Sequence, residues 1–223
     1  MKLFEKIMYP IFLIFMIYAI YCSRTDLIKF EDQLVAEDGL YQWLIFSTLI
    51  FASIMCFWRA TILKPFRGSL FSGVSSVLGI IFLLFALDEI SWMQRVFHFA
   101  SPEFFLTHNT RGQTNVHHLV LAGFYINNII FTLGVKIIAT LYFLIIPFLY
   151  PRMEKLRSFF NHYAIPIPRY TQVGAYVVLS LMVGMIKSEF KYVVFEFGFY
   201  WILVLMMYNP LNDEIFSRKS LVR

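Results

Sequence analysis

The residues that could carry out chemistry are concentrated between Asp88 and His118, in the longest part of the chain without an apolar run. The first half of this segment places four polar residues at positions i, i+3, i+7 and i+10: Asp88, Ser91, Arg95 and His98. On an α-helix such positions share one face. We therefore expect a helix at the membrane interface that presents a carboxylate, a hydroxyl, a guanidinium and an imidazole on one side.

The second half of the segment repeats this pattern after Gly112, which permits a turn. A helix over about residues 115–131, interfacial or re-entrant, is expected to follow. At helical spacing in this second half, Arg111, Asn115 and His118 share one face, and Gln113 and His117 share an adjacent one.

Further acidic residues are expected at the same depth. Glu37 and Asp38 precede Gly39 at the start of one apolar stretch, and Glu196 lies about one turn inside another. An unpaired charge inside a membrane span costs on the order of a few kcal/mol. Glu196 is therefore a functional-site hypothesis.

Carboxylates and imidazoles can exchange protons with a substrate, whereas guanidinium, amide and hydroxyl groups can bind its polar headgroup. The predicted catalytic residues are Glu37, Asp88, His117 and Glu196. The predicted substrate-binding residues are Asp38, Ser91, Gln94, Arg95, Arg111, Gln113 and Asn115. The sequence identifies no cofactor.

A metal site is the weaker hypothesis. Its candidate ligands would be His98, His117 or His118 with Asp88 or Glu37, since imidazole and carboxylate suit zinc. No compact motif such as HExxH accompanies them, so no metal ligand is predicted.

Part of this polarity has a simpler structural explanation. Asp88 and Arg95 would form an ion pair that fixes an interfacial helix, and we favour this over a direct catalytic role for that pair. Adjacent histidines point to different faces of a helix, so only one of His117 and His118 should enter a shared site.

Three strings resemble an uncharacterised family of bacterial multi-pass membrane proteins. They are residues 37–39 (Glu-Asp-Gly), residues 88–95 (Asp-Glu-Ile-Ser-Trp-Met-Gln-Arg) and the amides and histidine of residues 109–117. Met93 stands where that family has a glycine, and His118 where it has an asparagine. The resemblance implies a membrane protein with a polar site at these strings, and it implies no particular activity.

The elements that would position these residues are membrane-spanning helices. The chain is 59% hydrophobic and only 15% charged, with a mean hydropathy of +0.68, whereas a soluble domain has about a quarter charged residues. The apolar residues form continuous runs rather than alternating, which favours helices over a β-barrel. We expect an all-α, polytopic helical bundle that forms one domain over residues 1–223.

Six spans are expected, at about residues 7–22, 40–58, 69–87, 133–150, 170–186 and 192–208. Twelve of the 19 lysines and arginines would then lie on the side of the two termini, which the positive-inside rule assigns to the cytoplasm. The sequence thus predicts a protein of the bacterial cytoplasmic (inner) membrane with both termini in the cytoplasm. The polar segment 88–118 and its interfacial helices would lie on the outer side.

These expectations predict a polar site at the outer leaflet, where a hydrolase or transferase could act on a lipid or a lipid-linked substrate. The alternative is a non-catalytic sensor, channel or transporter subunit that uses the same cluster for binding or gating. Membrane lipids are the expected partners, with a second copy or another membrane protein as a further possibility. Nucleic acid is excluded, because the basic residues lie at predicted membrane boundaries and form no aromatic-lined groove.

Overall fold

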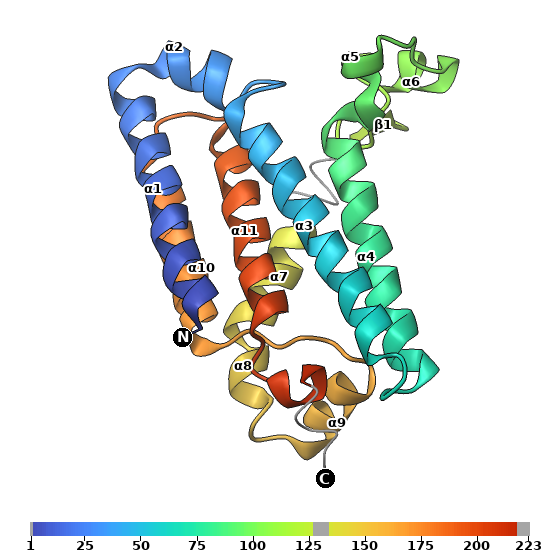
Figure 1. Ribbon diagram of the computed structural model, residues 1–223. Helices are drawn as coiled ribbons and strands as arrows, with labels where there is room; N and C mark the ends of the chain where they lie inside the picture. The colour runs from blue at the N-terminus through green and yellow to red at the C-terminus, as the bar shows by residue number, and fades with distance from the viewer. Residues whose placement is uncertain (1, 127–133, 218–223) are drawn as a thin grey trace.

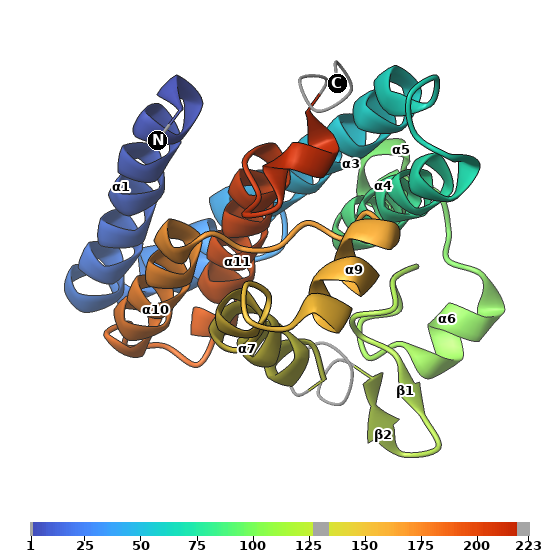
Figure 2. The same cartoon turned by 90° about the horizontal axis from the view of Figure 1, so that it is seen from below.

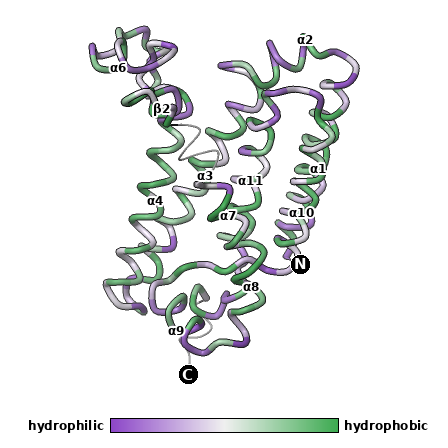
Figure 3. The backbone as a smooth tube through the Cα atoms, turned by 180° about the vertical axis from the view of Figure 1, so that it is seen from behind, coloured by the Kyte–Doolittle hydropathy of each residue, from purple (hydrophilic) through white to green (hydrophobic). Residues whose placement is uncertain are grey.

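The computed structural model describes residues 2–126 and 134–217, and only the backbone at Arg95 and Val135. Four helices in this part of the chain are long and apolar enough to cross a membrane: α1 (Leu3–Thr25), α3 (Leu40–Leu63), α4 (Ser69–Glu89) and α11 (Lys191–Tyr208). Their apolar lengths run between polar ends, as Figure 3 shows. The protein is therefore a helical membrane protein, as the composition predicts.

Two shorter apolar segments complete the bundle. One is α10 (Tyr170–Gly184), and the other is α7 (Val135–Leu144) followed by α8 (Ile146–Leu149). The predicted span at 133–150 is not one helix over its described residues, because the chain breaks at Ile145. Pro147 explains the break, since proline lacks the N–H of a continuous helix and clashes with the preceding turn.

The central helix is α11, which packs against α3, α10 and α1 (Figures 1 and 2). Phe197, Ile202 and Leu205 of α11 are fully buried in the core. Gly198 allows α10 to approach, because a Cβ atom there would lie 2.3 Å from a methyl carbon of Leu179.

Helices α3 and α4 form an antiparallel hairpin beside α11 (Figure 1). The Ser53 hydroxyl of α3 donates a 2.8 Å hydrogen bond to the carbonyl of Gly79 in α4. This contact and the small residue at position 79 keep the two helices close together. They thereby set the position of the end of α4 relative to α3.

One end of the bundle, called here the lower end, carries the start of α1, α9 (Glu154–His162) and η4 (Asp213–Phe216) (Figure 1). Arg169, which precedes α10, binds Asp213 of η4 at 2.8 Å. The beginning and the described end of the chain therefore lie at the same end of the bundle.

The opposite, upper end carries short elements: α2 (Leu27–Lys29), the π-helical turn η1 (Phe30–Leu34), η2 (Ser91–Met93), α5 (Gln94–Phe97) and α6 (Glu103–His108). The predicted single helix face of Asp88, Ser91, Arg95 and His98 is wrong, because α4 ends at Glu89. Ser91, Trp92 and Met93 follow with φ of 50°, 55° and 63°, a left-handed backbone that no right-handed helix can contain.

The helix predicted at about 115–131 is also wrong over its described residues. A loop runs to His118, and a two-stranded hairpin of β1 (Val120–Leu121) and β2 (Phe124–Tyr125) follows. Ala122 and Gly123 connect the strands with φ of 50° and 81°, the positive values that a two-residue hairpin turn requires. Residues 127–131 lie outside the described chain.

Candidate functional site

A cavity of about 570 Å³ opens at the upper end of the bundle. It lies where four parts of the chain meet: η1 with the start of α3, the end of α4, the start of α11 and the loop of residues 109–118. Its polar lining residues are Glu31, Asp32, Glu37, Gln42, Asp88, Glu89, Arg111, Gln113, Asn115, His117, His118, Tyr192 and Glu196.

Asp88 joins the last turn of α4 to the loop. One carboxylate oxygen, Oδ2, lies 2.7 Å from Nδ1 of His117, and the other accepts the backbone N–H of Val116 at 2.7 Å. The exposed fractions of the two side chains are only 15% for His117 and 8% for Asp88. The pair is therefore shielded from bulk water and fixed by both carboxylate oxygens.

The charge state of His117 follows from its neighbours. Burial disfavours the imidazolium, but the hydrogen bond to Asp88 and the charges of Glu89 and Glu196 outweigh burial and raise the pKa of His117 to about 9. At neutral pH His117 is consequently a cation with a proton to donate.

His118 behaves in the opposite way. Burial and the positive charges of Arg111 and His117 lower the pKa of His118 to about 4. His118 is therefore neutral at neutral pH. Two adjacent histidines of one cavity thus hold different protonation states, a division of roles that acid–base sites use.

Glu196 lies in the second turn of α11 and lines the cavity, and its side chain is half-buried. No described residue forms a hydrogen bond with its carboxylate. Its position is set by the packing of α11, since the next residue, Phe197, is fully buried against Phe15 and Tyr41. The carboxylate is thus held at the wall of the cavity without a fixed partner among the described side chains.

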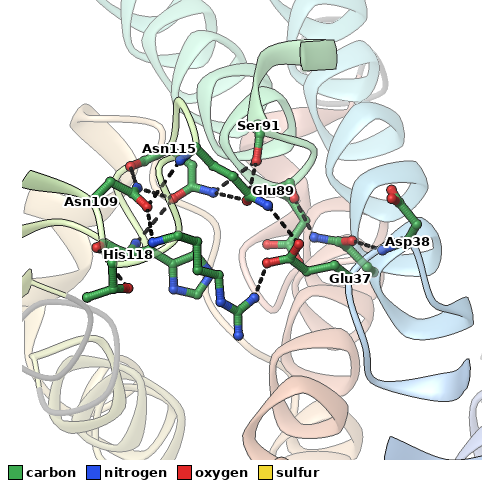
Figure 4. A network of polar contacts seen from close by, with 11 residues as sticks. Glu37, Asp38, Glu89, Ser91, Asn109, Asn115 and His118 are labelled. Carbon is green, nitrogen blue, oxygen red and sulfur yellow. Dashed lines mark hydrogen bonds and ion pairs between the residues drawn. The ribbon is translucent and has the colours of Figure 1, made fainter. Parts of the chain in front are cut away.

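Glu37 connects the segment before α3 to the same loop. It accepts an ion-pair hydrogen bond from Arg111 and a 2.7 Å hydrogen bond from the side-chain amide of Gln113. Figure 4 shows Glu37 between the start of α3 and this loop. Gly39 is required two residues later, because a Cβ there would lie within 2.9 Å of three carbonyl oxygens.

Asp38 does not line the cavity. It is exposed, with φ of 60°, and its N–H donates to the side chain of Gln42. Gln42 in turn donates a 2.6 Å hydrogen bond to the backbone carbonyl of Glu89. These contacts tie the beginning of α3 to the end of α4 (Figure 4).

The amide and hydroxyl side chains hold the shape of the loop (Figure 4). Asn115 donates 2.9 Å and 3.1 Å hydrogen bonds to Ser91 and Gln113, and Asn109 donates to Asn115 at 3.0 Å. Gln94 accepts the N–H of Thr114 at 2.9 Å. Much of the polarity between residues 91 and 115 therefore satisfies the backbone and side chains of the loop itself.

The structure brings all four predicted catalytic residues, Glu37, Asp88, His117 and Glu196, to one cavity. Of the predicted substrate-binding residues, Arg111, Gln113 and Asn115 also line it, whereas Asp38, Ser91 and Gln94 do not. The side chain of Arg95 lies outside the described part of the chain.

Sequence reasoning missed several lining residues: Glu31, Asp32, Gln42, Glu89 and Tyr192. Glu89 could have been found from its position next to Asp88 at the end of an apolar run. Glu31 and Asp32 belong to the π-helical turn η1, whose geometry residue types do not reveal.

The described side chains include no group of three or more histidines, cysteines, aspartates or glutamates arranged to hold a metal ion. Among the candidate ligands weighed from the sequence, His98 is exposed and does not line the cavity. His117 is engaged by Asp88 instead.

Comparisons of the chain with protein-family models, with curated proteins and with solved structures found no match.

Proposed function

We propose that this protein is a membrane-embedded hydrolase or transferase that acts on a lipid or a lipid-linked substrate at the outer leaflet. The observation that carries the proposal is the Asp88–His117 pair, which faces the same cavity as Glu196. An imidazolium and a carboxylate on one cavity form an acid–base pair, which typically contributes about 10²- to 10⁴-fold to the rate of a reaction.

The roles follow from the charge states. Asp88 binds Nδ1 of His117, which fixes the ring and leaves Nε2 as the atom that donates a proton to the departing group. Glu196, without a hydrogen-bond partner among the described residues, accepts the proton of the attacking water or substrate hydroxyl. Asp88 thus positions the imidazole, whereas His117 and Glu196 exchange protons with the substrate.

The charges of the cavity favour a substrate headgroup that is neutral or cationic and rich in hydroxyl or amino groups. Six carboxylates line it, and Arg111 already pairs with Glu37. Carboxylate and amide oxygens accept hydrogen bonds from such headgroups. Arg111, Gln113 and Asn115 remain the proposed binding residues, together with Arg95, while Asp38, Ser91 and Gln94 support them through the loop.

The described core of the bundle is largely apolar, which argues against passage of the substrate through it. Phe12, Met16, Ile45, Leu179 and Ile202 are fully buried in this core. This favours a site that opens on one side over the alternative of a channel or transporter.

The proposed membrane placement has six spans, both termini in the cytoplasm and the cavity on the outer face of the bacterial inner membrane. Its support is the lower end, which carries the start of α1 (Figure 1) and basic residues at helix ends, with Arg59 near the end of α3, Lys64 directly after α3 and Arg169 directly before α10. Fusion of a reporter that works only in the periplasm to either terminus tests it. An active fusion at either end would contradict the placement.

Lipid profiles of cells test the activity. Cells that overproduce the protein should lose one lipid species and gain its product, and cells that overproduce His117→Gln or Glu196→Gln at the same level should not. Glu103→Gln, an exposed change in α6, serves as the matched control and should behave as the unchanged protein. Identical profiles for all four proteins would argue for the non-catalytic alternative.

A further inference from the structure

A second hollow lies at the lower end of the bundle, on the side of α3 away from the candidate site. It has a volume of about 440 Å³ and is enclosed by the start of α1, the second half of α3, the end of α11 and η4. Among the described residues that line it, the walls are apolar and aromatic except for Arg59.

The length of this groove along α3 matches one leaflet of a membrane. Of the seven α3 residues that line it, five have helical spacing that places them on one face: Phe51, Ile54, Met55, Trp58 and Ile62. Phe51 and Ile62 are eleven residues apart, which corresponds to about 16 Å of helix, roughly half of the 30 Å hydrocarbon core. Ile54 and Trp58 are 58% and 67% exposed, so the groove is open along its side.

Arg59 supplies a charge near the lower end of the groove, about one turn of α3 before Ile62. One of its terminal nitrogens donates to the carbonyl of Tyr208 at 3.2 Å, and its guanidinium lies 4.9 Å from the ring of Phe216. The other terminal nitrogen is buried and has no hydrogen-bond partner. No described carboxylate forms an ion pair with Arg59, so its charge is uncompensated by the described protein.

A second cation lies at the same place. The ammonium group of Lys2 is 5.3 Å from the centre of the Tyr208 ring, and Tyr208 lines the groove. Phe4 packs on Tyr208 at 4.5 Å and forms the α1 side of the wall. Arg59 therefore lines an apolar groove about as long as an acyl chain in one leaflet, and Lys2 lies beside the Tyr208 wall of that groove.

We propose that this groove binds an anionic phospholipid of the leaflet opposite the candidate site. The acyl chain lies along the α3 face, and the phosphate is bound by Arg59 with Lys2 beside it. A guanidinium forms charge-assisted hydrogen bonds with phosphate oxygens. The proposal needs only that the protein spans a membrane, and it is independent of the proposed enzymatic activity.

Native mass spectrometry of the detergent-purified protein, with phosphatidylglycerol or phosphatidylcholine added at equal concentration, tests the proposal. The unchanged protein should retain phosphatidylglycerol about tenfold better, as expected for a charged hydrogen bond to phosphate. Arg59→Gln should abolish this preference. Lys64→Gln, which removes an exposed charge at the same end of α3, should keep it.

A second variant keeps the charge of Arg59, so it tests the proposal even if Arg59→Gln fails to fold. Ile54→Trp adds bulk at an exposed position of the groove, and it should reduce retention of both lipids. Equal retention of the two lipids by the unchanged protein would overturn the proposal. So would an unchanged preference in Arg59→Gln, or a groove occupied by a second copy of the chain, seen as a dimer free of lipid.

Discussion

Asp88 and His117 bring two distant parts of the chain together, with Oδ2 and Nδ1 separated by 2.7 Å. The other oxygen of Asp88 binds the backbone of Val116, so one carboxylate holds both the side chain and the main chain of the loop. The last turn of α4 thereby fixes the imidazole that we propose as the acid of the site.

Removal of Asp88 should destabilise the protein strongly. Asp88→Ala leaves a buried imidazolium and an unpaired backbone N–H, and breaking a buried charge pair costs about 3–5 kcal/mol. Thermal unfolding in detergent measures the effect. Glu103→Ala, an exposed change, should alter stability by less than about 0.5 kcal/mol. Equal effects of the two substitutions would show that the pair does not support the fold.

The stability of the protein should depend on pH through His117. Its pKa in the folded protein, about 9, lies above the ordinary value of 6.5. The contribution of the charged form is therefore fully present below pH 6.5 and is lost as the pH rises through 9. A shift of this size corresponds to a loss on the order of 3 kcal/mol.

Unfolding measured from pH 6 to about 10 tests whether stability falls as the pH rises. The decline over that range should be much smaller in His117→Gln, and unchanged in His162→Gln, which lies in α9 at the lower end. A decline of the same size in His117→Gln would assign the pH dependence to other groups.

The contact between Glu37 and Arg111 should be energetically modest. The exposed fractions of the two side chains are 31% and 41%, and exposed pairs contribute about 0.2–1 kcal/mol. A double-mutant cycle with Glu37→Gln and Arg111→Gln should give a coupling energy in this range. A coupling above about 2 kcal/mol would mean that the pair is shielded as Asp88 and His117 are.

Packing of α10 against α11 should be sensitive at Gly198 and insensitive at Gly174. A Cβ at Gly198 would lie 2.3 Å from Leu179, whereas nothing lies within 4 Å of a Cβ at Gly174. Gly198→Ala should cost about 1–3 kcal/mol, and Gly174→Ala should be neutral or slightly stabilising, because alanine favours a helix. Thermal unfolding of the two variants makes the comparison, and a neutral Gly198→Ala would contradict the close approach of the helices.

The long helices could be predicted from the sequence, because α3 and α4 are continuous apolar runs whose ends are marked by Gly39 and Glu89. The convergence of Glu37, Asp88, His117 and Glu196 could be predicted for the same reason. Glu37, Asp88 and Glu196 lie near the ends of spans, so their depths agree before any packing is known, and His117 belongs to the polar segment predicted on the same side. The six-span count stays a prediction, since α10 and the broken α7–α8 segment are short.

The backbone between Ser91 and His118 could not be predicted. Three successive non-glycine residues with positive φ, beginning at Ser91, leave no signature in residue type. Their conformation is held by tertiary contacts, such as the hydrogen bond from Asn115 to Ser91. Periodicity therefore suggested a helix where long-range hydrogen bonds impose a loop, and with it the wrong grouping of side chains on faces.

Turnover by the purified protein tests the central claim most directly. The protein in lipid nanodiscs made from a total bacterial lipid extract would be followed by mass spectrometry, beside Glu196→Gln and Glu103→Gln. We predict loss of one lipid and appearance of its product with the unchanged protein and with Glu103→Gln, and a rate at least about 100-fold lower with Glu196→Gln. Turnover by Glu196→Gln at the rate of the unchanged protein would contradict an acid–base site in this cavity.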